Sequence, residues 1–509
     1  MKSVKKKAAK KVVKKIAKKV VKKTITKPVK AATKKVTVTN KKAATKKTIA
    51  TKKIAIKKVA TKKVATKKAV ETYNKEKLQK LLSSAIKLSR ADHIEIYCSI
   101  EDREATRFSD NAISQNLAQK DIKIRISSHK GNRVGKVELN SFDSKMLENA
   151  IRQSEEIVNI LPDDPEYVPP LKKSEEKKYL KSLMSIKDMN NHLSFEEIAK
   201  KIKEGIDPCK KVGAKFAGSY KHSRYQEAFM NSNGLFAHGY YSAIDWTNIV
   251  VMPGGESGYA HSLASNVLDL DFKKTSKEAL TKAIAAQNAV DIAPGKYTVI
   301  LSPEAIDEII LYAFWGGFEA KKCDDGLSYL RGKLGEKVFD SSLTVTSDPT
   351  NKFVPSMTFD DQGSAYKKRA WIKNGVIENL CYSRYWALKN NREATLNPTN
   401  LIVEGNDKVT IDDLISETEN GILITRLWYI RFVDPMIPSI TGMTRDGTFL
   451  IKDGKIVSAI KNMRFNDSIV RILSSIEKIA KRIPAGEFLR NYIPAMKIRD
   501  FNFTSGTTF

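Results

Sequence analysis

Residues 1–70 contain no aspartate, glutamate or arginine and no aromatic side chain. What they do contain is lysine, which makes up 28 of these 70 residues. A segment with so much charge of one sign and no aromatic residue buries too little apolar surface to offset the entropy lost on ordering. We therefore predict that residues 1–70 form a disordered, lysine-rich tail.

The tail also lacks the marks of a targeting segment. It has no apolar stretch of the length that a secretory signal requires, and it has no arginine and a single serine where organelle transit peptides favour both. Lysines at this density release counterions from DNA or RNA, which gives sequence-independent and salt-sensitive binding. The composition resembles the lysine-rich tails of linker histones and bacterial histone-like proteins. Two alternatives stay open, namely a solvated extension without a specific partner and a contact with an anionic membrane surface.

The lysines that we predict to bind nucleic acid are the repeated KK pairs in the later part of the tail. They are Lys41, Lys42, Lys46, Lys47, Lys52, Lys53, Lys57, Lys58, Lys62, Lys63, Lys67 and Lys68.

The remaining residues lack any comparable excess of charge, because the tail supplies 28 of the 33 net positive charges. They contain no run of eighteen apolar residues, so no transmembrane segment is expected. Cys98, Cys209, Cys323 and Cys381 lie far apart and form no CxxC pair. This spacing argues against a disulfide framework or a zinc knuckle and is typical of a reducing cytoplasm.

Patterns of apolar residues predict an α+β protein. Helical spacing indicates helices at 74–88, 141–161, 194–209, 276–290 and 304–320, and alternation indicates strands at 93–101, 121–139 and 296–303. Turn sequences such as DDQG, KNG and RDG divide the chain beyond residue 321 into short strands. We expect an N-terminal helix and antiparallel-sheet region at 72–290 with a linker at about 162–193, followed by a β-rich C-terminal domain at 291–509.

Motifs for hydrolytic chemistry are missing. None of the six histidines falls in HExxH or HExxxH, and residues 262–509 contain no histidine. A helical zinc hydrolase needs two imidazoles on one face and a nearby glutamate to activate water. GxSxG is also absent, and PGGESG at 253–258 is neither a Walker A motif nor a GxGxxG loop.

Six local sequences nevertheless resemble, in the same order, those of the TldD/PmbA family across nearly all of residues 72–509. They are GNRVGKVELNSFDSKMLENAI, FMNSNGLFA, YTVILSPEAIDEIILYAFWGGFEA, PSMTFDDQGSAYKKRAWIKNGVIENLCYSRYWA, ITGMTRDGTFLIKDGKI and PAMKIRDFNFTSG. The resemblance implies a cytoplasmic, metal-dependent peptidase system that acts on small or unfolded peptides. It also implies two related subunits around an enclosed chamber. The TldD type carries HExxxH and a zinc-binding cysteine near its C-terminus, whereas the TldE type, also called PmbA, lacks these ligands.

In this chain, Leu311, Tyr312 and Gly316 occupy the places of the His, Glu and His of that motif, and the segment GEFLRNYIPAMKI contains no cysteine. The resemblance therefore implies no catalytic residue, metal ligand or cofactor here, and zinc in a catalytic partner. An acidic group of Glu304, Asp307, Glu308 and Glu319 has two interpretations, a site for a harder cation and an exposed helix face.

We predict a noncatalytic, TldE/PmbA-like subunit of a TldD/TldE-type metallopeptidase complex. Its partner is a TldD-like catalytic subunit in a heterodimer or larger assembly, and exposed strand edges at 447–459 or 408–415 are candidates for holding the peptide substrate. One alternative is an active metal-dependent hydrolase with a rearranged site that uses His222, His238, His261 or the acidic residues. The other is a nucleic-acid-associated protein whose tail is the functional part. The expected location is the cytoplasm, with attachment to the nucleoid if the tail binds DNA.

Overall fold

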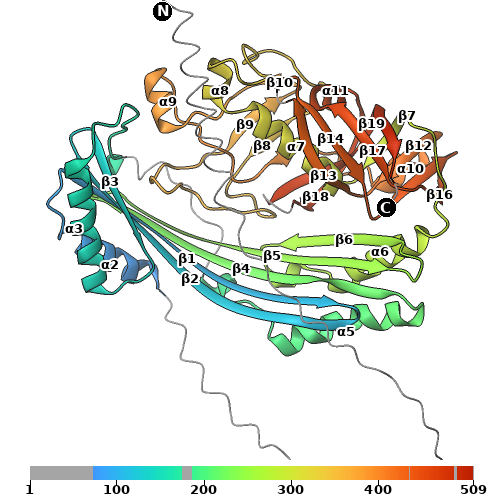
Figure 1. The fold of residues 1–509 in the computed structure, drawn as a ribbon, viewed down its shortest axis with the longest axis horizontal. Helices are drawn as coiled ribbons and strands as arrows, with labels where there is room; N and C mark the ends of the chain where they lie inside the picture. Colours follow the sequence, from blue (N-terminus) through green and yellow to red (C-terminus); the bar gives the residue numbers. More distant parts are fainter. Residues whose placement is uncertain (1–72, 175–185, 435, 487–489, 508–509) are drawn as a thin grey trace, which may run out of the picture. The chain divides into compact units, whose positions relative to one another are not determined.

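The computed structural model describes residues 73–174, 186–434, 436–486 and 490–507, and Thr72–Phe509 form one compact unit (Figure 1). The predicted tail and its candidate lysines lie outside the described residues. Within the described ranges, no helix is long and apolar enough to cross a membrane.

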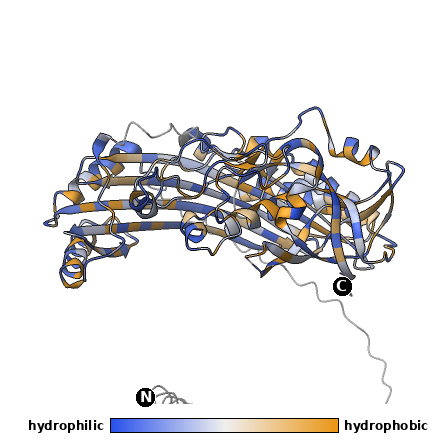
Figure 2. Ribbon diagram, turned by 90° about the horizontal axis from the view of Figure 1, so that it is seen from above, coloured by the Kyte–Doolittle hydropathy of each residue, from blue (hydrophilic) through white to orange (hydrophobic). Residues whose placement is uncertain are grey.

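The first half of this unit is built on a six-stranded antiparallel sheet in the order β3-β2-β1-β4-β5-β6. The strands are β1 (His93–Ser109), β2 (Ala112–Lys130), β3 (Arg133–Leu139), β4 (Lys215–Asn231), β5 (Phe236–Val251) and β6 (Ser257–Ala264). β1 pairs with β4, so strands from before and after the predicted linker share one sheet. In Figure 2, apolar and polar residues alternate along these strands, as expected when side chains project to opposite faces.

Helices cover the two ends of one face of this sheet. They are α2 (Lys75–Ile86), α3 (Ser144–Ile160), α4 (Ile186–Met189), α5 (Phe195–Lys211) and α6 (Phe272–Ala285), with a short 3-10 turn at Val267–Asp269. Asn74, Asp143, Ser194 and Asp271 cap the four long helices by accepting hydrogen bonds from backbone N–H groups of the first turn. One core lies between α2, α3 and the Ile96 end of the sheet, and a second lies between α5, α6 and the Trp246 end.

The second half contains a 13-stranded sheet and several short helices. The strands are β7 (Gly295–Leu301), β8 (Val345–Ser347), β9 (Arg369–Lys373), β10 (Val376–Ile377), β11 (Ile402–Val403), β12 (Asn420–Ile424), β13 (Leu427–Asp434), β14 (Ser439–Thr444), β15 (Thr448–Lys452), β16 (Lys455–Ala459), β17 (Met463–Ser468), β18 (Ile476–Ala485) and β19 (Asn491–Gly506). The helices are α7 (Pro303–Gly317), α8 (Ala320–Asp324), α9 (Arg384–Lys389), α10 (Ile411–Ser416) and α11 (Ile469–Ser474).

Two features of this region matter for the site. The predicted strand and helix at 296–303 and 304–320 are present as β7 and α7, and α7 buries Ile306, Ile309 and Ile310 in the main core. β19 lies in the middle of the sheet, because it pairs with β11 on one side and with β7 on the other, and further along with β17 and β18.

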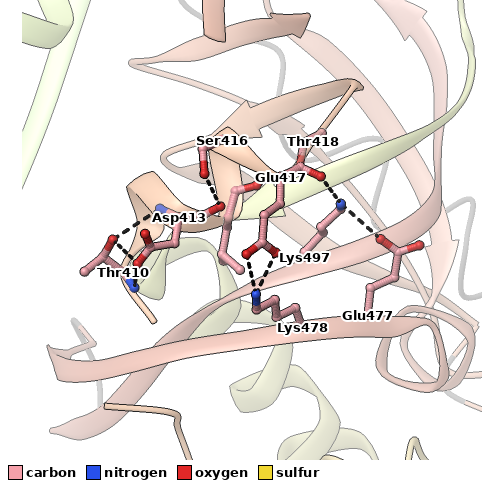
Figure 3. A network of polar contacts seen from close by, with 9 residues as sticks. Thr410, Asp413, Ser416, Glu417, Thr418, Glu477, Lys478 and Lys497 are labelled. Carbon is pink, nitrogen blue, oxygen red and sulfur yellow. Dashed lines mark hydrogen bonds and ion pairs between the residues drawn. The ribbon is translucent and has the colours of Figure 1, made fainter. Parts of the chain in front are cut away.

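The predicted α+β architecture is confirmed, with corrections to single segments. The strand predicted at 408–415 is wrong, because α10 occupies most of it. Thr410 Oγ1 accepts a 3.2 Å hydrogen bond from Asp413 N, and Asp413 Oδ2 accepts one of 2.7 Å from Thr410 N (Figure 3). This capping box favours a helix over a strand. Lys478 of β18 then binds Glu417 just after the helix, with Nζ–Oε2 at 2.6 Å.

The strands predicted at 447–459, 93–101 and 121–139 are present. Residues 447–459 form the hairpin β15–β16, with β16 at the edge of the sheet. Strands continue through 102–120, which the sequence patterns did not indicate, so β1 and β2 are much longer than predicted. The division at residues 290 and 291 stays a prediction.

Candidate functional site

One face of α7 forms a wall of a cavity of about 310 Å³. Pro303 begins the helix and Ser302 precedes it as N-cap, which fixes the start of the helix at the end of β7. The side chains on the cavity wall recur every three or four residues and therefore share one face of the helix. They are Glu304, Asp307, Glu308, Tyr312 and Trp315.

The opposite wall is β13, which is irregular at this point. Its pairing with β14 shifts between Trp428 and Arg431, and Tyr429 adopts a left-handed backbone with φ of 57°. Such a conformation is rare for a bulky residue and is often found at functional sites. Tyr312 Oη of α7 donates a 2.5 Å hydrogen bond to the carbonyl oxygen of Ile430, which holds the two walls together. β13 pairs with β14 alone among the described strands, so its other edge has no strand partner there.

Arg426 lines the cavity and contacts the N-terminal sheet. Its guanidinium lies 4.0 Å from the ring centroid of Tyr259 and 4.8 Å from that of Trp428, a cation–π arrangement on both sides. The same group forms an ion pair with Asp446, with Nη1–Oδ2 at 3.0 Å. Oδ1 of Asp446 in turn accepts a 2.6 Å hydrogen bond from Ser257 Oγ of β6. Arg426 is therefore a positioned, partly desolvated charge in the cavity.

His261 is the histidine of the candidate set that lines this cavity. Its Nε2 lies 3.2 Å from Oδ1 of Asp245 on the neighbouring strand. Burial alone would raise the pKa of Asp245, but the hydrogen bond from His261 and the charge of Arg490 outweigh burial and lower this pKa below its ordinary value. The Asp245 carboxylate therefore orients the His261 imidazole.

The other two candidate histidines point to the opposite face of the sheet. His222 pairs in register with Ile244, and His261 with Thr247, and these two positions on β5 alternate in direction. His222 is fully buried, its Nε2 lies 2.9 Å from Ser242 Oγ, and burial lowers its pKa to about 3. His238 shares the face of His222, and burial lowers its pKa to about 4. The three histidines are thus not brought together.

The predicted acidic group is only partly assembled. Asp307 is buried and accepts a 2.6 Å hydrogen bond from Asn491 Nδ2, and Glu304 and Glu308 line the cavity beside it. Glu319 lies apart at the start of α8, where its carboxylate pairs with Lys322 at 2.6 Å. In the part of the chain that the structure describes, no group of three His, Cys, Asp or Glu residues is placed to hold a metal ion.

The three positions that replace HExxxH differ in their surroundings. Leu311 is fully buried in the core, and Tyr312 lines the cavity. A Cβ atom on Gly316 would lie 2.9 Å from the ring of Phe432, so the aromatic ring occupies the space that a side chain would need. None of these groups is a donor that zinc prefers. The residues present therefore do not fit a zinc ion at this helix.

The β13 wall was missed by reasoning from the sequence alone. The segment RLWYIR at 426–431 interleaves arginine with aromatic residues, the side chains most enriched at binding surfaces. This pattern is the signal that could have identified it. Trp428 and Tyr429 are exposed, and so is Trp315 across the cavity.

Comparisons with known proteins identify the fold and the C-terminal domain. Residues 294–505 match the model of the PmbA/TldA metallopeptidase C-terminal domain. The structure is similar to TldE from Thermococcus kodakarensis, with a TM-score of 0.75 at 18% identity over 84% of this chain and 99% of that chain.

Relatives in sequence align over shorter stretches. An uncharacterized protein of Methanocaldococcus jannaschii is 29% identical over 36% of this chain and 46% of that protein. A metalloprotease of Methanothermobacter thermautotrophicus is 24% identical over 53% of this chain and 63% of that protein. The chain thus spans about half to two thirds of the length of these relatives. Residues 294–505, which contain the β7–α7 unit and the central β19, thus form a domain of the PmbA/TldA metallopeptidase C-terminal type.

Proposed function

We propose that this chain is a noncatalytic, TldE-like subunit that pairs with a TldD-like catalytic subunit in a zinc metallopeptidase complex for small or unfolded peptides. The observation that carries the proposal is the replacement of the metal site on α7. Leu311 is buried in the core, and Phe432 fills the space beside Gly316. Zinc and the hydrolytic step belong to the partner in this proposal.

The cavity between α7 and β13 supports a role in holding peptide. Trp428 and Tyr429 project from β13, whose second edge has no strand partner among the described residues. An extended peptide can hydrogen-bond to such an edge, and exposed aromatic side chains beside it bury apolar peptide side chains. We therefore propose β13 as the peptide contact in preference to the 408–415 segment, most of which is helical.

The first experiment tests the partnership. We expect native mass spectrometry of this chain, co-expressed with a TldD-like protein from the same source, to show a heterodimer or a larger assembly of both chains. The chain alone should carry less than about a tenth of an equivalent of zinc, because its described residues form no closed donor set. A chain that stays monomeric with its candidate partner, or that binds zinc and hydrolyses peptides alone, contradicts the proposal.

A second experiment tests the peptide contact in that complex. Trp428→Ala together with Tyr429→Ala should weaken peptide binding about tenfold, because aromatic anchors are each worth on the order of 1 kcal/mol or more. Leu388→Ala is a matched control, because Leu388 is an exposed apolar residue on α9. Equal peptide affinity for both variants would remove β13 from the proposed contact.

We further propose that the lysine pairs of residues 41–68 bind polyanions and attach the cytoplasmic complex to nucleic acid. Its support is the charge, because 28 lysines and no acidic residue occur in residues 1–70. Deleting residues 1–70 should abolish retention on DNA without changing the peptidase activity of the complex. For the full chain, a plot of the logarithm of the association constant against the logarithm of the salt concentration should have a negative slope. Its magnitude should be about 0.9 for each phosphate that the tail neutralises. A flat salt response contradicts this part of the proposal.

A further inference from the structure

A second cavity, of about 290 Å³, lies on the face of the N-terminal sheet opposite α2 and α3. Its floor consists of side chains from β1, β2 and β3, and its cover consists of the segment after α3 together with residues near 361 and 384. The cavity shares no lining residue with the one beside α7. Its volume is at the lower end of small-molecule sites.

Two buried polar side chains on its floor have unsatisfied atoms. Glu95 is 9% exposed and His129 is 4% exposed, and Oε2 of Glu95 lies 3.4 Å from Nε2 of His129. Among the described residues, neither Oε1 of Glu95 nor either ring nitrogen of His129 has a hydrogen-bond partner. Register places the two residues on the same face, because Glu95 pairs with Ser127, two residues before His129. A buried carboxylate oxygen without a hydrogen bond is costly, so the site favours a bound group that donates to Oε1 of Glu95.

The arginines at this cavity already bind acceptors of the chain. Arg125 forms ion pairs with Glu138, at 2.9 Å, and with Asp361. Arg384 donates to the carbonyl oxygen of Pro169 at 2.5 Å. Among the described residues, the ion-pair partner of Glu95 is His129, and no arginine or lysine lies within ion-pair distance of its carboxylate, although Lys136 also lines the cavity.

Four aromatic side chains line the cavity, together with polar and charged ones that include Lys136, Asp164 and Glu166. Tyr97, Tyr167, Phe229 and Tyr385 all contribute to the wall. The ring of Tyr167 meets that of His129 edge-on at 5.8 Å. Burial and the nearby Glu95 charge raise the pKa of Tyr167, so this residue stays a neutral phenol. Aromatic faces near a carboxylate with one free oxygen form an environment that attracts an organic cation.

We propose that this cavity, named here the Glu95 cavity, binds a primary ammonium group, with Glu95 as the charged acceptor. An imidazole ring carries an N–H donor in both of its protonation states. His129 can therefore donate to a carbonyl oxygen next to the ammonium group, as found at the amino terminus of a short peptide. A free aliphatic amine shares the ammonium but not that carbonyl group.

Calorimetry on the full chain separates these sources with three probes: glycylglycine, N-acetyl-glycylglycine and ethylamine. We expect glycylglycine to bind and its acetylated form not to bind, because acetylation removes the charge. Ethylamine should bind at least about tenfold more weakly if the carbonyl contact of His129 contributes. Equal binding of ethylamine identifies a free-amine site. Binding of the acetylated peptide as tightly as of glycylglycine, or no heat from any probe, overturns the proposal.

Two variants connect the binding to the residues. Glu95→Gln should weaken glycylglycine binding more than tenfold and leave the urea midpoint of the ligand-free protein unchanged or higher, because an unsatisfied buried charge is removed. Glu148→Gln makes the same change on the exposed surface of α3 and should alter neither. A lower urea midpoint for Glu95→Gln together with unchanged binding would show that Glu95 is structural.

Tyr167→Leu keeps the carboxylate and removes one aromatic wall. It should weaken the binding of glycylglycine about threefold to tenfold, which keeps the test decisive if Glu95→Gln does not fold. Unchanged affinity in Tyr167→Leu contradicts the proposed aromatic lining.

Discussion

Asn491 donates a 2.6 Å hydrogen bond from Nδ2 to Oδ1 of Asp307, which links the start of β19 to α7 inside the C-terminal core. Asn491 is fully buried, and its Oδ1 accepts a 2.7 Å hydrogen bond from the backbone N of Leu401. One side chain therefore satisfies groups of two other segments. Asp307 lines the α7 cavity, so this link lies at the cavity wall.

Asn491→Ala should lower the free energy of unfolding by about 2–4 kcal/mol, because it leaves a buried carboxylate without one donor and a buried backbone N–H without its acceptor. Urea unfolding followed by tryptophan fluorescence measures this loss. Asn149→Ala, on the exposed face of α3, is the control and should change stability by less than about 0.5 kcal/mol. Equal effects of the two substitutions would show that the buried bridge contributes little.

Gly316→His tests whether the zinc ligand can simply be restored. We expect a loss of about 1–3 kcal/mol of stability and no zinc binding, because the new Cβ would lie 2.9 Å from the Phe432 ring. Phe432→Ala in the same chain should relieve part of the clash, so the double variant should lose less than the sum of the two single changes.

Gly506→His is the matched control, because nothing lies within 4 Å of a Cβ at that position. Thermal unfolding and zinc analysis of the four variants decide the matter. A stable Gly316→His protein that binds an equivalent of zinc would contradict our reading of α7.

Glu227 makes the folded chain sensitive to pH near neutrality. Burial raises the pKa of Glu227 to about 7. The charge of Asp361 also raises this pKa, and a hydrogen bond with Tyr97 lowers it in part. Since the folded pKa exceeds the unfolded value, the folded state binds the proton more tightly, and stability from this group falls as pH rises from about 4.5 to 7. We expect Glu227→Gln to reduce the fall in the free energy of unfolding between pH 5 and pH 8 by on the order of 1–3 kcal/mol. Urea unfolding at pH 5 and pH 8 measures it, and an unchanged difference between the two pH values rules it out.

His222 has the opposite effect at acid pH. Burial lowers its pKa to about 3, so the folded state keeps the imidazole neutral while the unfolded chain takes up a proton below about 6.5. Its contribution to stability is present above that value and is lost as pH falls toward 3. His222→Gln should therefore flatten the stability profile between pH 6.5 and 4 relative to the parent chain, as measured by urea unfolding across that range. A parallel profile for the two proteins would contradict the assignment.

Local sequence was enough to predict the elements whose signals are local. Helical spacing at 141–161 and 194–209 predicted α3 and α5. The structure shows Asp143 as the N-cap of α3 and a capping box of Ser194 and Glu197 at α5. The middle of β1 was missed because Asp102 and Glu104 interrupt the apolar alternation. These carboxylates pair with Arg224 at 3.0 and 3.1 Å, a partner that only the folded sheet brings close.

The candidate site could be predicted only in part for the same reason. The acidic and aromatic positions of α7 were visible because they lie on one helix. Tyr259 and the 426–431 segment join them only through the pairing of distant strands, and no local pattern records that proximity. The Glu95 cavity was missed entirely, because its lining comes from the sheet and from two loops far along the chain.

The central place of β19 has a consequence for biosynthesis. β7 begins at Gly295, but β19, which pairs with one edge of β7, begins only at Asn491. At typical translation rates this interval lasts on the order of 10–40 s, and during it β7 presents unpaired backbone groups. The nascent C-terminal domain is therefore a candidate client for chaperones on the ribosome, and its sheet can close only after the chain has been made through β19.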